Sequence, residues 1–342
     1  MTSLHVVQVV RSDSFAGVER YVCDVSHGLV QRGHRVTVVG GDPAVMRREL
    51  PDAATYRPAA TTAQVARALS SCGRPAVVHA HMTAAELGAV LSRPVHRAPV
   101  VGTRHFASTR GSSLPARAVG ACLQKALAAE VSISDFVARQ TGPGSTVIPN
   151  GVADRAPRPR VGVQRHVLCL QRLEQEKQPL VAVDAFAQSG LAENGWRLRI
   201  AGRGALSGSV DARVRALGLE ASVDMLGFVD DVERELVAAA CLLATAPSEP
   251  FGLSVVQASA LAVPVVAAAG GAHIETLQGS DLLFPPGDAR TAADVLRRVA
   301  GDPDGAALQG ERAQARQRAH YSLETHVGRL VELYDGLSTG RG

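Results

Sequence analysis

Residues 248–269 read SEPFGLSVVQASALAVPVVAAA, and this stretch decides the fold of the second half of the chain. We interpret it as an acidic loop, a buried helix that begins at Gly252 and a buried strand that begins at Val265. Glu249 lies just ahead of the helix, so a carboxylate, the free N–H groups of the first turn and the positive end of the helix dipole converge there. Such a point favours anions and hydroxyl groups, and the diphosphate of a nucleotide sugar would suit it.

Short apolar segments alternate with helical patterns in both halves of the 342-residue chain. This alternation predicts parallel sheets covered on both faces, as in Rossmann-like α/β domains. A turn-rich connection predicts an N-terminal domain of residues 1–155 and a C-terminal domain of residues 156–323, with ligands beyond the carboxyl ends of the strands. The expected strands are residues 5–10, 35–39, 77–80, 99–103, 130–133 and 146–148, then 166–170, 197–201, 223–226, 241–245, 265–267 and 282–284.

The composition is that of a globular protein with two cores, because 46% of the residues are apolar. The five cysteines show neither metal-ligand spacing nor a disulfide framework, so we expect buried free thiols. The amino terminus begins directly with a strand pattern, and no apolar segment is long enough to span a bilayer. These features predict a cytoplasmic protein.

Basic residues concentrate in the first half of the chain. Residues 1–155 carry 17 basic and 10 acidic side chains, a net charge of +7, whereas residues 156–342 carry 19 and 22, a net charge of −3. Two interpretations stay open: a surface that attracts an acidic acceptor or makes peripheral contact with the inner face of a membrane, and a solvated arginine-rich surface without a partner. Sparse aromatic residues and the lack of a recognition motif argue against nucleic acid.

The order Glu-Pro-Phe-Gly, four residues, Gln-Ala-x-Ala and Pro-Val-Val-Ala in residues 249–267 resembles the signature of retaining glycosyltransferases of family 4, which have the GT-B fold. The resemblance implies two Rossmann-like domains facing a cleft, with a closing helix at about 324–342 that packs back on the N-terminal domain. It also implies metal-independent, configuration-retaining transfer of a sugar from a nucleotide-diphosphate donor to an acceptor hydroxyl. The acceptor would be a glycan, a lipid or a small molecule, and no cofactor would be needed.

The resemblance also assigns roles within the motif. Glu249 would contact the transferred sugar, and Gln257 stands where the family has a second Glu that holds the ribose hydroxyls. Glutamine still accepts a hydrogen bond but without charge assistance, so we expect weaker donor binding or a changed donor preference. The backbone amides that would bind the donor belong to Phe251, Gly252, Leu253 and Ser254.

Arg172 and Lys177 follow the predicted strand 166–170, in the segment LQRLEQEKQP. Two cations on a loop at a strand end can clamp a diphosphate. The chain has 34 Arg and only two Lys, so Lys177 is more informative than a generic cation. The segment resembles the family's Gly-Arg-Leu…Glu-Lys-Gly, with Gln171 and Gln178 in place of the two glycines. A solvated cluster with the neighbouring glutamates is the alternative.

Other positions receive less specific assignments. Gly17 joins the first strand to the first helix, where a glycine lets the backbone approach a phosphate, and Gly202 would border the nucleotide. His105 ends a buried strand, and by the resemblance it contacts the transferred sugar; a purely structural histidine is the alternative. His79 and His81 end another strand and would support it. The Asp-Pro-Asp segment 302–304 lies in a polar loop, so we assign no metal to it.

The resemblance implies a front-face displacement in which the leaving phosphate accepts the acceptor's proton, and the lack of an obvious enzymic nucleophile fits this. Two alternatives stay open. One is a nucleotide-sugar epimerase with the same fold, and the other is a non-catalytic nucleotide-sugar-binding homologue, suggested by the glutamines at 171, 178 and 257. The sequence lacks Gly-x-Gly-x-x-Gly, which argues against a dehydrogenase.

Overall fold

The computed structural model describes residues 3–108, 110, 114–155 and 163–340. The chain divides into two compact units. Unit 1 comprises Met1–Gly151 and Leu323–Gly342, and unit 2 comprises Val152–Ser322. Residues 152–155 therefore belong with unit 2, where the amide of Val152 donates to the carbonyl of Tyr321 at 2.9 Å.

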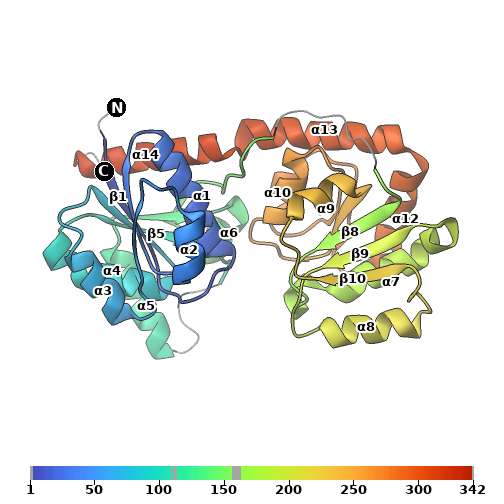
Figure 1. The fold of residues 1–342 in the computed structure, drawn as a ribbon, viewed down its shortest axis with the longest axis horizontal. Helices are drawn as coiled ribbons and strands as arrows, with labels where there is room; N and C mark the ends of the chain where they lie inside the picture. Colours follow the sequence, from blue (N-terminus) through green and yellow to red (C-terminus); the bar gives the residue numbers. More distant parts are fainter. Residues whose placement is uncertain (1–2, 109, 111–113, 156–162, 341–342) are drawn as a thin grey trace. The chain divides into compact units, whose positions relative to one another are not determined.

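Unit 1 is built on a seven-stranded parallel sheet in the order β3-β2-β1-β4-β5-β6-β7. Helices cover the sheet on both sides (Figure 1). The strands are β1 (His5–Val10), β2 (Arg35–Val39), β3 (Thr55–Arg57), β4 (Val77–His81), β5 (Val100–Arg104), β6 (Ala129–Ser132) and β7 (Thr146–Val147). The helices are α1 (Gly17–Gln31), α2 (Pro43–Glu49), α3 (Thr62–Ser70), α4 (Thr83–His96), α5 (Leu114–Ala126), α6 (Asp135–Thr141) and α14 (Leu323–Ser338).

Unit 2 repeats this plan with a six-stranded parallel sheet in the order β10-β9-β8-β11-β12-β13. Its strands are β8 (His166–Leu170), β9 (Arg197–Ala201), β10 (Val223–Gly227), β11 (Cys241–Ala244), β12 (Val265–Ala268) and β13 (Leu283–Phe284). Its helices are η1 (Gln175–Lys177), α7 (Pro179–Ser189), η2 (Leu191–Asn194), α8 (Ser207–Ala216), α9 (Val232–Ala238), α10 (Leu253–Ala260), α11 (His273–Thr276), α12 (Ala289–Gly301) and α13 (Pro303–His320).

The predicted fold class is confirmed, since both units are parallel α/β sheets of the Rossmann type. Strand β3 is the element that the sequence analysis missed. It has three residues, lies at the edge of the sheet and is exposed or half-buried, so it carries no continuous apolar pattern. Pattern reading fails for such strands because their stability comes from pairing with a neighbour.

The last helix belongs to unit 1, although more than a hundred residues separate it from the rest of that unit. Val327, Leu330, Val331 and Tyr334 of α14 are buried in the unit 1 core. Helices α14 and α1 cross closely there: a Cβ atom on Gly28 would lie 2.7 Å from a methyl group of Val327. The spacing of the four buried residues is that of one helical face.

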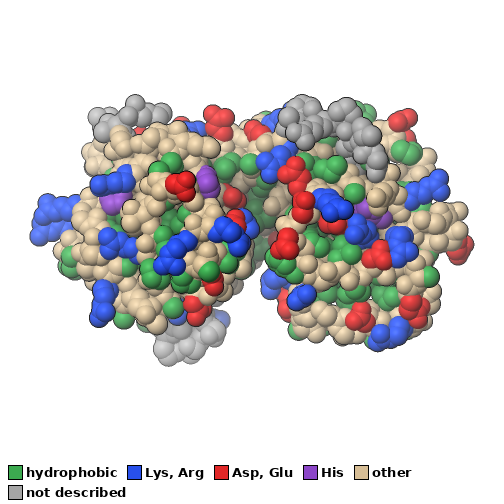
Figure 2. Space-filling view, viewed as in Figure 1, with side chains coloured by type: hydrophobic (Ala, Val, Ile, Leu, Met, Phe, Trp, Pro, Cys, Tyr) green, Lys and Arg blue, Asp and Glu red, His purple; other side chains and the backbone are tan. Residues whose placement is uncertain are grey.

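The described surface bears out some compositional expectations and corrects one. All five cysteines are free, and Cys23, Cys169 and Cys241 are buried, but Cys122 is exposed because it lies on the outer face of α5. Among the described helices, none has the length and apolar character needed to cross a membrane. On the viewed face, basic and acidic side chains are interspersed over each unit (Figure 2).

Candidate active site

The two most central strands of the unit 2 sheet are β8 and β11, and the strand order reverses between them. Helices that follow β8 and β11 therefore leave in opposite directions, and a crevice opens at the carboxyl ends of the two strands. The loop after β8 carries Lys177, and the loop after β11 carries Glu249. The chain thus brings both predicted residues to the place where ligands of open α/β sheets bind.

Lys177 and Glu249 form an ion pair, with 2.5 Å between Nζ and Oε2. Their side chains are only 17% and 14% exposed, so the pair is partly shielded from water. A partly buried ion pair is screened less by water and salt than a surface pair, and removal of one partner leaves an uncompensated charge. The structure therefore places the predicted sugar-contacting carboxylate and the predicted phosphate-binding cation in one group.

Gln171 braces this group. Its side-chain amide donates to the carbonyl of Lys177 at 3.0 Å and to the hydroxyl of Thr245 at 2.9 Å. The Thr245 hydroxyl in turn donates to the same Lys177 carbonyl at 2.7 Å. Gln171, which replaces a glycine of the family motif, thus connects the loop after β8 to the end of β11.

Arg172 lies on the same loop and pairs with a different carboxylate. Its guanidinium contacts the Glu176 carboxylate at 2.6 Å, and both side chains are about 60% exposed. Exposed ion pairs contribute about 0–1 kcal/mol, so this contact holds Arg172 only weakly. The structure brings Lys177 and Glu249 together and leaves Arg172 in a neighbouring surface pair.

Gln178 adopts the left-handed backbone conformation that its glycine counterpart in the family would adopt freely, with φ 49° and ψ 52°. The turn is needed because η1 ends there and α7 begins with Pro179. A residue with a Cβ atom is strained in this region. In addition, the Gln178 side-chain oxygen is buried without a partner in the described part of the chain. The loop thus has a backbone conformation that suits glycine, although the residue at this position is glutamine.

Helix α10 begins at the site, with Gly252 as its N-cap at φ 86°. The first-turn N–H groups of Leu253 and Ser254 are of the kind that has no partner within a helix. Phe251 is 3% exposed and packs edge-on against Tyr321, so its side chain belongs to the interior of unit 2. Gln257 lies one turn further on and is half-buried, and its side chain has no hydrogen bond among the described residues.

His273 is a site residue that the sequence analysis missed. It follows β12, is 1% exposed, and donates from Nδ1 to the carbonyl of Ala268 at 3.0 Å. A Cβ atom on Gly252 would lie 3.3 Å from its Nε2. Burial lowers the pKa of His273, although the nearby Glu249 carboxylate opposes this shift. The neutral ring therefore presents Nε2 as an acceptor close to the start of α10.

The loop before His273 supports Glu249. The amide of Ala272 donates to the Glu249 carbonyl at 2.8 Å. A Cβ atom on Gly271 would lie 2.4 Å from the Glu249 backbone, so glycine is required for this approach. Gly270 and Gly271, two residues after the end of a buried strand, were the signal in the sequence that could have identified this loop.

Gly202 has a structural explanation. Its φ is 144°, and a Cβ atom would lie 1.9 Å from the carbonyl oxygen of Gln171. Only glycine permits this contact between the loops after β8 and β9. A role beside the nucleotide stays a prediction for this residue.

Unit 1 holds the other two predicted residues. Gly17 begins α1, and a Cβ atom there would meet nothing within 4 Å. His105 follows β5, is 8% exposed, and lies 3.1 Å from His81, between Nε2 of His105 and Nδ1 of His81. Burial lowers the pKa of His105 to about 3. His79 and His81, expected to support His105, are completely buried beside it.

Asp302 has a local role at the start of α13. Its carboxylate accepts the amide of Gly305 at 2.9 Å and so caps the helix. Among the residues that the structure describes, no group of His, Cys, Asp and Glu is arranged to hold a metal ion.

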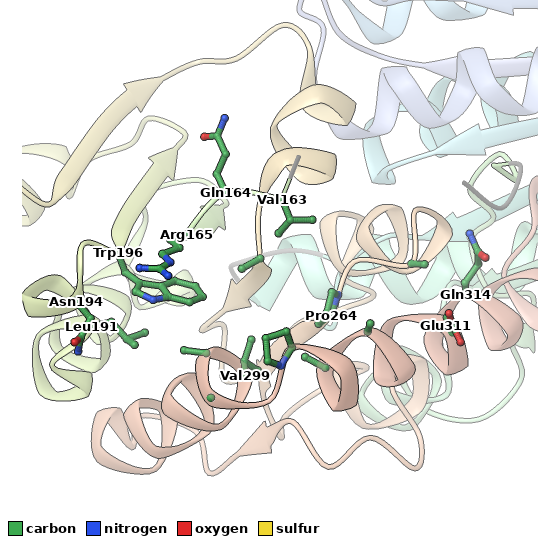
Figure 3. A pocket seen from close by; sticks show the side chains of 17 residues that line it. Val163, Gln164, Arg165, Leu191, Asn194, Trp196, Pro264, Val299, Glu311 and Gln314 are labelled. Carbon is green, nitrogen blue, oxygen red and sulfur yellow. The ribbon is translucent and has the colours of Figure 1, made fainter. Parts of the chain in front are cut away.

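A groove of about 1130 Å³ lies at the other end of the unit 2 strands from Lys177 and Glu249. Trp196, Pro264 and Val299 line it together with residues that precede β8 and β11 (Figure 3). None of the predicted site residues lines it. It lies at the amino ends of the strands, whereas ligands of such sheets bind at the carboxyl ends.

Comparison with known families agrees with this geometry. Residues 153–319 match the family described as glycosyl transferases group 1, and residues 15–155 match glycosyltransferase family 4. The two matches together extend from residue 15 to residue 319, so the chain belongs to the glycosyltransferases of group 1 and family 4, as the resemblance in the motif 249–267 had indicated.

Two curated relatives show how far the similarity extends. The chain is 35% identical over 222 residues to a D-inositol 3-phosphate glycosyltransferase of Kineococcus radiotolerans, covering 55% of this chain and 51% of the relative. It is 30% identical over 207 residues to an exopolysaccharide phosphotransferase of Streptomyces coelicolor, covering 59% of this chain and 22% of the relative. The alignments thus span about half or less of the length of these relatives.

Solved structures share the whole fold. The Anabaena HepE protein in complex with UDP and glucose matches with a TM-score of 0.81 at 20% identity, covering 98% of this chain and 100% of that chain. AviGT4, a glycosyltransferase involved in avilamycin A biosynthesis, matches with a TM-score of 0.75 at 24% identity, covering 98% of each chain. These similarities establish the GT-B fold.

Proposed function

We propose that the protein transfers a sugar from a nucleotide-diphosphate donor to an acceptor hydroxyl, with retention of the anomeric configuration and without a metal ion. The observation that carries this proposal is the Lys177–Glu249 pair beside the start of α10, at the crevice between β8 and β11. The pair places a cation, a carboxylate and helix N–H groups together. These are the groups that a sugar diphosphate requires.

The donor diphosphate would bind the first-turn amides of α10 and the Lys177 ammonium. Charge builds up on the leaving diphosphate during transfer, and donors fixed in advance around it stabilise the transition state. Arg172 would join them by exchanging Glu176 for a phosphate oxygen, because its surface ion pair costs at most about 1 kcal/mol to break. Lys177 then takes the place that a divalent cation would otherwise fill.

Glu249 would contact the transferred sugar through hydrogen bonds to its hydroxyls, oriented by Lys177 and by the loop of Gly271. In the proposed step, the bond from the anomeric carbon to the phosphate oxygen breaks as the bond to the acceptor oxygen forms on the same face. The acceptor's proton moves to the departing phosphate oxygen. Atoms and charges balance without a protein nucleophile. His105 and Gly17 in unit 1 keep the roles that the family resemblance predicts for them.

A surface of helix α4 in unit 1 suits contact with a membrane. Leu91 and Val95, one turn apart on α4, are 64% and 56% exposed, and Arg93 and Arg97 are exposed between and beyond them. Apolar and cationic side chains on one helix suit peripheral contact with an anionic membrane. We therefore propose a cytoplasmic enzyme at the inner face of a membrane. Flotation with phosphatidylglycerol vesicles tests this, and binding equal to that of Leu91→Ser/Val95→Ser would contradict it.

The catalytic proposal is tested by screening nucleotide sugars for a rise in melting temperature, since a bound donor stabilises the folded state. The selected donor is then incubated with candidate acceptors, and released nucleoside diphosphate is measured. Acceptor-dependent release with an unchanged anomeric configuration in the product supports the proposal. Binding without any release would indicate a non-catalytic homologue, and conversion of the donor without acceptor would indicate an epimerase. Loss of activity in EDTA that magnesium restores would contradict metal independence.

A further inference from the structure

A continuous chain of buried polar side chains crosses unit 1. It runs from strand β5 through β4, helix α14 and β1, back to β4, and ends at His105. Every member is at most 8% exposed. The successive contacts are Thr103 Oγ1 to His79 Nε2 (2.6 Å), His79 Nδ1 to Tyr334 Oη (2.5 Å), Tyr334 Oη to Gln8 Nε2 (3.4 Å), Gln8 Oε1 to His81 Nε2 (2.7 Å) and His81 Nδ1 to His105 Nε2 (3.1 Å).

The three imidazole rings of this chain are neutral near pH 7. Burial lowers the pKa of His79 and of His105 to about 3, and it lowers the pKa of His81 well below its ordinary value. A neutral imidazole has one N–H group, so it donates at one nitrogen and accepts at the other. Between Gln8, His81 and His105, one direction therefore fixes the others, whereas the hydroxyls of Tyr334 and Thr103 can donate or accept toward His79.

The amide of Gln8 is the member that sets this direction, because its two ends differ chemically. Its oxygen faces His81 and can only accept, so His81 donates from Nε2 and accepts at Nδ1. His105 must then donate from Nε2 to His81. On the other side, the Gln8 NH2 group donates to Tyr334, whose hydroxyl is free to donate to His79. Every contact of the chain then joins one donor to one acceptor.

We propose that Gln8 is a positioning residue for the transfer reaction: through His81 it holds His105 in the Nε2–H tautomer, so that Nδ1 is presented as a hydrogen-bond acceptor. Nδ1 has no hydrogen bond in the described part of the chain. This inference rests on the proposed function and on the predicted contact of His105 with the transferred sugar. It also narrows the donor, because a lone pair accepts a sugar hydroxyl and repels a carboxylate, so neutral sugars are favoured over uronic acids.

The opposite direction is chemically possible and would give the opposite site. If the Gln8 amide were turned, its NH2 group would donate to His81, His81 would donate from Nδ1 to His105, and His105 would carry a hydrogen on Nδ1. That nitrogen would then donate to a ligand oxygen and would accommodate a carboxylate. The two cases therefore differ in an observable property of one ring.

The test is a long-range ¹H–¹⁵N spectrum of the full-length protein labelled at histidine, with the His105 signals assigned by comparison with His105→Gln. We expect Nε2 of His105 to be of the N–H type and Nδ1 to be of the unprotonated type at pH 7. In Gln8→Leu the direction is no longer imposed, and we expect both nitrogens to shift toward intermediate values that report a mixture of tautomers. Tyr334→Phe releases the other end of the Gln8 amide, and we expect a smaller shift in the same sense.

Steady-state kinetics provide a second, independent measurement. Gln8→Leu is expected to lower kcat/KM for the selected neutral donor about tenfold, the value of one hydrogen bond. Gln314→Leu is the matched control, because Gln314 is also buried and bonded, to the Ala260 carbonyl of unit 2, and should leave the tautomer and kcat/KM unchanged. An N–H on Nδ1 in the wild type, a charged ring, or an unchanged tautomer in both Gln8→Leu and Tyr334→Phe would overturn the inference. The spectrum needs no substrate, so an inactive protein with the expected tautomer would refute only the proposed function.

Discussion

The two units share one fold but place different electrostatics near their predicted site residues. In unit 2, Lys177 and Glu249 are charged, partly exposed and paired with each other. In unit 1, His105 ends a neutral, buried chain of hydrogen bonds whose three histidines have lowered pKa values. Charged groups suit the neutralisation of a diphosphate, whereas a neutral ring in a fixed tautomer suits the orientation of a hydroxyl group. In the proposed function, unit 2 would bind the leaving group and His105 of unit 1 would orient the sugar.

The largest expected effect is a difference in acid stability between the two units. In unit 1 burial lowers the pKa of His326 to about 4 and that of His79 and His105 to about 3. The unfolded chain takes up these protons near pH 6.5, so the stabilisation is complete above pH 6.5 and is lost as the pH falls toward 3–4. Each such histidine contributes about 1.4 kcal/mol per pH unit within that range.

Hydrogen exchange at pH 7 and pH 5, corrected for intrinsic rates, measures this difference. Strands β1, β4 and β5 of unit 1 should lose protection at pH 5, while β8 and β11 of unit 2 keep more of theirs. Burial also lowers the pKa of His273 in unit 2, but equal losses in the two sheets would contradict the greater acid sensitivity expected of unit 1.

The next effect concerns Lys177. Lys177→Ala removes a charge-assisted contact and leaves Glu249 unpaired, and should reduce turnover about 10- to 100-fold, or about 1.5–3 kcal/mol. Lys125→Ala is the natural control, since Lys125 is the other lysine of the chain and is exposed on α5. Steady-state kinetics with the selected donor compare the two. Similar activity in both variants would remove Lys177 from the site.

The parts of this site that could be predicted from the sequence are those whose residues lie close together along the chain. The motif from Glu249 to Gln257 is contiguous, so its helix start and its carboxylate could be predicted from one segment. The ion pair joins residues 72 positions apart, and residue types alone gave both partners but not their contact. His273 was missed because its closeness to Gly252 follows from the pairing of β11 with β12 and not from local pattern.

The chain of hydrogen bonds through the histidines of unit 1 was even harder to predict from the sequence. His79 and His81 share one face of β4, which the period of a strand predicts. Their partner Tyr334 comes from a helix 255 residues further along, and the direction of the hydrogen bonds depends on Gln8 in the first strand. Burial in a shared core, and not any motif, brings these groups together.

Gln257 gives a smaller effect that sharpens the account of unit 2. Gln257→Glu should tighten donor binding, because a carboxylate accepts stronger hydrogen bonds from ribose hydroxyls. Gln257→Ala should weaken binding by about 1 kcal/mol and leave much of the turnover at saturating donor. Titration calorimetry with the selected donor decides this. Affinity that is indifferent to both changes would place Gln257 outside the site.

The smallest effect concerns the strained loop that carries Lys177. Gln178→Gly relieves the left-handed backbone of this residue and removes a buried oxygen without a partner, and should stabilise the fold by about 0.5–1 kcal/mol. Gln175→Gly, three residues earlier and without a positive φ, should be neutral or destabilising. Urea denaturation measures both. A destabilised Gln178→Gly protein would show that the side chain, and not the backbone shape, is what the loop needs.

The central claim is that the donor binds unit 2 at the carboxyl ends of β8 and β11. Its most direct test is hydrogen exchange of the whole protein with and without the nucleotide sugar that the thermal-shift screen selects. Protection is predicted in residues 171–178 and 249–257, around Lys177 and the start of α10. Protection confined to residues 191–196 and 299–307, which line the groove at the other end of the strands, would contradict the claim.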